Sequence, residues 1–77
     1  MKQIIKEQIA TFVSEYNRVC ERQMIAEFEN DSCFISGEEI ISSTFIEMFE
    51  EAFPEKPLDY YIGVRGTSIY MCIYKSL

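Results

Sequence analysis

The sequence predicts a small α+β domain in which two helices pack on an antiparallel sheet, in the order α-β-β-α-β-β. Two segments carry apolar residues at the three- and four-residue spacing of amphipathic helices, and two other segments alternate apolar and polar residues around turn signals. The chain has 77 residues, of which 48% are apolar and 26% charged, as in ordinary globular proteins. We therefore expect one folded domain over residues 1–77 with one core.

The first helix is predicted over residues 3–21. Its apolar residues recur at helical spacing, namely Ile5, Ile9, Phe12, Val13, Tyr16, Val19 and Cys20. A short hairpin is predicted over residues 23–36, because Met24, Ala26 and Phe28 alternate before the turn signal Asn30-Asp31. The alternative is that the first helix continues through Ile25 and Phe28.

The second helix is predicted to begin at Ser36 and to run to about Phe53. Ser36 and Glu39 have the spacing of a capping box, in which each side chain bonds a backbone amide near the start of the helix. Pro54 and Pro57 prevent its continuation.

A terminal hairpin is predicted where the apolar period changes to two. Alternate residues on each side of a turn within Arg65–Ser68 would share one face, namely Tyr60, Ile62, Val64, Ile69, Met71 and Ile73. The other face would carry a stripe of Tyr61, Tyr70 and Tyr74. This stripe is open if both helices pack on the Ile/Val face, and it is core if the first helix packs on it.

The residue inventory argues against catalysis and against a bound cofactor or metal. The chain has no histidine, which excludes Ser-His-Asp and Cys-His arrangements and most zinc sites. Cys20, Cys33 and Cys72 form no C-x-x-C pair, and we expect them to be small buried apolar residues. The three glycines match neither phosphate-binding loop motif. We therefore expect a noncatalytic protein.

The net charge of −6 is concentrated in the middle of the chain. Residues 27–59 hold ten acids against Lys56 alone, a net charge of −9, whereas both flanking segments are slightly positive. Such a field repels nucleic acid and attracts basic surfaces, so direct nucleic-acid binding is not expected. The alternative is that the acids only keep a small protein soluble.

These features predict a protein-binding module, a small acidic inhibitor or adaptor that presents an acidic helix face to a basic protein surface. The partner would include nucleic-acid-binding proteins, which an acidic mimic blocks, and the size and charge resemble those of phage or mobile-element inhibitors. The residues expected to bind the partner are the acids and flanking isoleucines of the second helix together with the tyrosine stripe, namely Glu39, Ile40, Ile46, Glu47, Glu50, Glu51, Tyr61, Tyr70 and Tyr74. The alternative for Ile40 and Ile46 is that further structure covers them.

The sequence also bears on location and assembly. The chain has three cysteines, an odd number that leaves one unpaired, and it has no apolar secretory or membrane segment. We therefore expect a soluble cytoplasmic protein. A core of this size supplies only a few kcal/mol, so a homodimer would add stability.

Residues 33–53, CFISGEEIISSTFIEMFEEAF, resemble the strand-loop-helix segment of STAS-like domains, the anti-sigma-factor-antagonist type. Ser36-Gly37 and Ser42-Ser43-Thr44 occupy the comparable places, whereas Phe34 replaces the usual acid of the strand. The resemblance implies a helix that starts near Ser42 and a regulatory switch in which Ser42 or Ser43 is phosphorylated or contacts a partner.

Overall fold

The computed structural model describes residues 2–37, 41–54 and 58–75. Within these ranges the chain forms helix α1 (Gln3–Cys20), strands β1 (Ile25–Glu29) and β2 (Ser32–Ser36), helix α2 (Ser43–Ala52), and strands β3 (Leu58–Arg65) and β4 (Ser68–Lys75). The predicted α+β class and the order α-β-β-α-β-β are confirmed. The strands form one antiparallel sheet in the order β1-β2-β4-β3.

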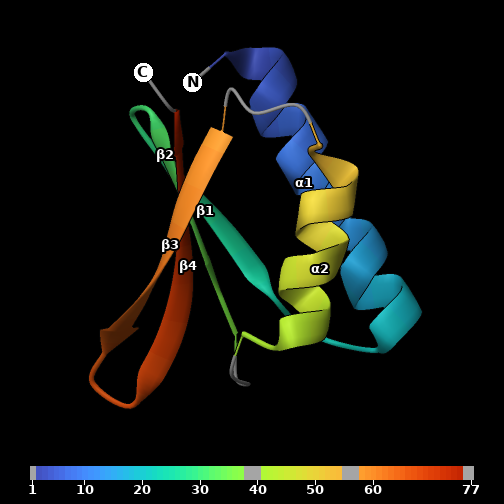
Figure 1. The fold of residues 1–77 in the computed structure, drawn as a ribbon, viewed down its shortest axis with the longest axis vertical. Helices are drawn as coiled ribbons and strands as arrows, with labels where there is room; N and C mark the ends of the chain where they lie inside the picture. Colours follow the sequence, from blue (N-terminus) through green and yellow to red (C-terminus); the bar gives the residue numbers. More distant parts are fainter. Residues whose placement is uncertain (1, 38–40, 55–57, 76–77) are drawn as a thin grey trace.

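Both helices lie on the same side of the sheet (Figure 1). We call this side the inner face and the opposite side the outer face. The core forms between the helices and the inner face, where Ile35, Met71 and Ile73 have no exposed surface. Phe45 of α2 is equally buried, and its ring meets those of Phe12 and Tyr16 of α1 edge to face.

Helix α1 ends at Cys20, so the alternative of a longer first helix is wrong. Glu21 adopts a left-handed conformation with φ of 54°, and its backbone N–H bonds the carbonyl of Asn17. The Asn17 side chain then holds the start of the hairpin, because its amide donates to the Met24 carbonyl at 2.9 Å and its oxygen accepts from the Met24 N–H at 2.8 Å. The β1–β2 turn follows at Asn30-Asp31 as predicted, with a positive φ at Asn30.

The predicted start of the second helix is wrong. Ser36 is the last residue of β2 and pairs with Ile25, while Glu39 lies outside the described residues. The cap is Ser42, whose hydroxyl accepts from the Phe45 N–H at 3.1 Å. The helix therefore begins where the resemblance to STAS-like domains implied, and it ends one residue before Phe53.

The terminal hairpin forms where predicted, with the six expected residues on one face, and the structure gives the register that the sequence left open. Tyr60, Ile62 and Val64 pair with Ile73, Met71 and Ile69, and Arg65 pairs with Ser68. The turn is therefore Gly66-Thr67, in which Gly66 alone has a positive φ, of 63°. A glycine at the first of two turn positions is typical of the type II′ turn, whose twist suits a hairpin. In the part of the chain that the structure describes, no helix is long and apolar enough to cross a membrane.

Candidate binding surface

The tyrosine stripe lies on the outer face, which neither helix covers. Side chains alternate between the two faces of a strand, so the partners of the buried inner residues point outward. Tyr61 is 47% exposed, and Tyr70 and Tyr74 are half-buried. Figure 1 shows both helices on the other side of the sheet. Of the two arrangements that the sequence allowed for the stripe, the open one is therefore the one observed.

The three tyrosines form a connected aromatic surface. The ring centroid of Tyr61 lies 6.3 Å from that of Tyr70 and 6.0 Å from that of Tyr74. Phe34 of β2 extends this surface, with its centroid 5.9 Å from Tyr70. Cys72 is buried beneath the rings. A hydrogen bond between the Tyr61 hydroxyl and Cys72 is the main cause that raises the pKa of Tyr61 to about 12.

Gly63 allows one of these rings to lie flat against the sheet. It pairs directly with Tyr70, and a Cβ atom built at Gly63 would collide with the Tyr70 ring. The space that Gly63 leaves empty is thus filled by its cross-strand neighbour, a known way to stabilise a glycine within a strand. The position of Tyr70 on the outer face consequently depends on Gly63.

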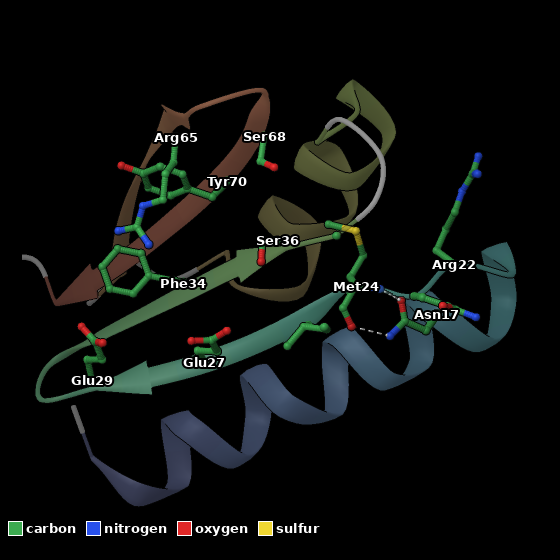
Figure 2. A pocket seen from close by; sticks show the side chains of 13 residues that line it. Asn17, Arg22, Met24, Glu27, Glu29, Phe34, Ser36, Arg65, Ser68 and Tyr70 are labelled. Carbon is green, nitrogen blue, oxygen red and sulfur yellow. Dashed lines mark hydrogen bonds between the residues drawn. The ribbon is translucent and has the colours of Figure 1, made fainter.

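The outer face also contains a hollow of about 850 Å³ (Figure 2). Phe34, Tyr70 and Ile25 are among the residues that line it, and Glu27 and Glu29 of β1 project into it. Arg65 reaches over this region from the tip of the β3–β4 hairpin, with its guanidinium carbon 5.9 Å from the centre of the Tyr70 ring. The Tyr70 ring therefore already makes a cation–π contact with the guanidinium group of Arg65.

The predicted binding residues fall on two sides of the molecule. Glu47 and Glu51 are exposed on α2, which lies across the sheet from the tyrosine stripe. Glu50 is also exposed, but it accepts a 2.6 Å hydrogen bond from the hydroxyl of Tyr60, and this bond raises the pKa of Tyr60. One flat partner surface cannot contact both the helix acids and the tyrosine stripe.

The isoleucines predicted to accompany the helix acids have different outcomes. Ile46 is half-buried and packs against the core, as the alternative of structural cover expects, and its part in a partner surface stays a prediction. The reason is its position on the flank of α2, one residue after Phe45 and three before Phe49, both of which are buried. Ile40, like Glu39, lies outside the described residues.

The thiols among the described residues differ in burial. Cys33 and Cys72 are buried, as expected, and Cys20 is half-buried. Burial raises the pKa of the Cys33 thiol to about 12, which keeps it protonated at neutral pH. Over residues 2–37, 41–54 and 58–75, no three histidine, cysteine or acidic side chains gather closely enough to hold a metal ion.

Phe34, Ile25 and Glu27 of the outer face were missed by sequence reasoning. Their signal was present in the alternation of both first-hairpin strands, since Phe34 lies between the buried Cys33 and Ile35 and therefore must point the other way. No protein family, curated protein or solved structure matches this chain significantly.

Proposed function

We propose that this protein is a noncatalytic binding module that holds a basic segment of a partner protein against the outer face of its sheet. The observation that carries the proposal is the connected aromatic surface that neither helix covers. Tyr61, Tyr70, Tyr74 and Phe34 would each contribute apolar area and a polar or π-electron contact to an interface. The fold has two layers, the helices and the sheet, and aromatic residues lie on the uncovered side of the sheet. This side is suited to a third layer supplied by a partner.

The charges of the outer face favour a basic partner. Three acids, Glu27, Glu29 and Asp59, lie on this face of the sheet, against Arg65 on the sheet and Arg22 at the hollow. Arg65 is already stacked over Tyr70, which leaves Glu27 and Glu29 of β1 to meet cations of the partner. A lysine or arginine of the partner can also bind the face of a tyrosine ring, with a gain of about 0.5–1 kcal/mol at an exposed site.

The acids of α2 have a different part in this proposal. Glu47 and Glu51 lie across the sheet from the aromatic surface, so they contribute to the overall field rather than to the contact. The net charge of −6 raises the rate of encounter with a basic partner and repels nucleic acid. Replacement of the helix acids should therefore slow association and reduce its salt dependence, whereas replacement of outer-face aromatics should speed dissociation.

Site-specific photo-crosslinking in the native host tests the proposal directly. A benzophenone amino acid at Tyr61 samples the outer face, and the same amino acid at Glu47 is the matched control on the helix side. We expect a basic protein to be joined to the Tyr61 probe and not to the Glu47 probe. A partner that is captured only through Glu47 would contradict the proposal.

Affinity purification provides the second arm of the test. We expect Tyr61→Ser and Tyr74→Ser to lose the partner that the wild type retains, while the Glu47→Gln/Glu51→Gln variant keeps it at physiological salt. Circular dichroism of each variant shows whether the fold is intact. Equal retention by the tyrosine variants and the wild type would refute the assignment of the surface.

A regulatory switch of the STAS-like kind is the second candidate function. The start of α2 favours it, because Ser42 caps the helix and the exposed Ser43 opens its first turn. A phosphate on Ser43 would be stabilised by the helix N-terminus. Mass spectrometry of protein from its native source should then find phosphate on Ser43, and a fully unmodified chain would contradict this function.

A further inference from the structure

The two edges of the sheet differ in how they resist pairing with another strand. The edge strand β1 is only five residues long, and its outer-face side chains include Glu27 and Glu29. In any antiparallel self-pairing with the two-fold axis between residues 27 and 29, these acids would face acids of the second copy, which is unfavourable. The edge strand β3 is eight residues long and carries one acid near its start and one arginine at its end. Only β1 has the charge pattern that protects an edge.

The backbone of β3 presents alternate residues to the free edge. In a hairpin closed by a two-residue turn, the flanking residues form a hydrogen-bonded pair, here Arg65 and Ser68, and this pairing recurs at every second residue. The N–H and C=O groups of Tyr60, Ile62 and Val64 therefore point away from β4. In agreement, the Tyr60 N–H bonds the carboxylate of Asp59, at 2.9 Å, rather than a strand neighbour.

Two of these outward residues, Ile62 and Val64, have exposed side chains although they are apolar. Ile62 is 42% exposed and Val64 is 70% exposed, on the inner face that the helices cover elsewhere. Figure 1 shows the reason, because the β3–β4 hairpin extends beyond the ends of both helices. An eight-residue edge with free backbone groups and exposed apolar side chains is a template for another strand.

We propose that β3 pairs antiparallel with β3 of a second copy of this chain, with Ile62 on the two-fold axis. In this register Asp59 of each copy lies opposite Arg65 of the other, so both ends of the join have complementary charges. Val64 lies opposite Tyr60, which packs its ring against Phe49 of α2. The exposed Val64 of each copy is thereby covered by a residue that the other copy's helix holds in place.

Neighbouring registers lack this complementarity. A two-fold axis at Tyr61 places Arg65 opposite residue 57, a proline, and an axis at Gly63 places Arg65 opposite Tyr61. In the register centred on Ile62, residues whose N–H and C=O groups point away from β4 lie opposite the same kind of residue in the second copy. This pairing gives about six backbone hydrogen bonds. The partner is thus a second copy of this chain, recognised by an edge that is complementary to itself.

Charge reversal tests the register. Asp59→Arg places arginine opposite Arg65, and Arg65→Asp places aspartate opposite Asp59, each at both ends of the join. We expect sedimentation equilibrium to show a wild-type dimer and to show each variant alone dimerising about tenfold more weakly. An equimolar mixture of the two variants should form heterodimers with wild-type affinity or better, because the charges are again complementary.

The matched control is Glu29→Arg, which makes the same charge change on the opposite edge and should leave dimerisation unchanged. Hydrogen exchange supplies a backbone readout. The Ile62 and Val64 amides should become protected as the concentration rises, while those of Tyr61 and Gly63, which bond β4, should be protected throughout. A wild type that stays monomeric at about 1 mM would overturn the proposal. A dimer that both charge variants form as readily as the wild type would overturn it equally.

This proposal stands apart from the proposed function. Failure of the Tyr61 crosslink leaves the β3 join untouched, and a monomeric wild type leaves the outer face available to a partner. The two sets of measurements therefore fail separately.

Discussion

Gly63→Ala should destabilise the protein only while Tyr70 is present. The added Cβ would lie 2.8 Å from Cε1 of the Tyr70 ring and closer still to its hydroxyl end. Gly63 is not among the residues with positive φ, so its backbone conformation suits alanine as well as glycine. The substitution therefore isolates the collision between one methyl group and one ring.

Two opposing effects set the expected magnitude. Alanine in place of glycine within a strand stabilises by about 0.5–1 kcal/mol, because the unfolded chain loses freedom. Forcing a methyl group into occupied space costs about 1–3 kcal/mol. We therefore expect a net loss of about 1 kcal/mol in the wild-type background. With Tyr70→Ala already present the collision is gone, and the same change should stabilise by about 0.5 kcal/mol.

The measurement is a double-mutant cycle by urea denaturation of the wild type, Gly63→Ala, Tyr70→Ala and the double variant. The chain has no tryptophan, so far-ultraviolet circular dichroism is the suitable signal. The coupling energy should be about 1–3 kcal/mol, and additivity within about 0.5 kcal/mol would refute the proposed contact. Gly66→Ala is the control, since Gly66 has φ of 63° and open space around it, so its cost should not depend on Tyr70.

Three further changes test the chemistry of the core and the helix ends. Above pH 9 the free energy of unfolding should fall by up to about 1.4 kcal/mol per pH unit, because burial raises the pKa of Cys33 from 9.0 to about 12 and the unfolded chain releases this proton first. Cys33→Ala should make that fall shallower in denaturation curves recorded across this pH range, and an unchanged slope would exclude the thiol as its cause. Asn17→Ala should cost about 2 kcal/mol through two lost hydrogen bonds to Met24, and Asn17→Asp, which keeps the acceptor, should cost less in the same denaturation assay. Ser42→Ala should lower the free energy of unfolding by about 1 kcal/mol and Ser36→Ala by less than about 0.5 kcal/mol, and the reverse order would mean that Ser36 is the cap.

The elements that local sequence determines were predicted well. The first helix was expected over residues 3–21 and is observed over Gln3–Cys20, because its apolar stripe continues for five turns without interruption. The face shared by six residues of the terminal hairpin was predicted correctly, because the period of two fixes which side chains lie on the same side, whereas the register was left open between two turn positions.

The start of the second helix could not be decided from the capping signals alone, because two of them compete there. Ser36 and Ser42 both have the side chain and the surroundings of a cap. Ser36 is taken by the sheet, where its backbone pairs with Ile25. That pairing is a tertiary contact between two strands, which the local pattern around residue 36 does not encode.

The exposure of the tyrosine stripe was also undetermined by local sequence. The terminal hairpin has two faces that are apolar enough to form a core. Strand β2 resolves this ambiguity, since it pairs with β4 in a register that adds Cys33 and Ile35 to the face of Met71 and Ile73. The inner face becomes wide enough for both helices only after that addition, and the aromatic face is left uncovered.

The proposed join at β3 and the proposed binding face affect one another in a testable way. Pairing about Ile62 keeps the odd-numbered residues of β3 on the outer face in both copies, so the two aromatic surfaces lie on the same side of the joined sheet and all helices lie on the other side. A partner with two basic segments would then bind both surfaces, with a gain in affinity of about 10²-fold or more that needs no new contact. Asp59→Arg should remove this gain without removing an aromatic side chain, and the equimolar mixture with Arg65→Asp should restore it. Tyr74→Ser should weaken binding by the same factor in the wild-type and the Asp59→Arg backgrounds, because Tyr74 is on β4, one strand in from the join. Surface plasmon resonance measures both effects, with the partner found by crosslinking or purification as the molecule in solution. Equal affinity of Asp59→Arg and wild type for a two-segment partner would contradict the coupling between the join and the binding face.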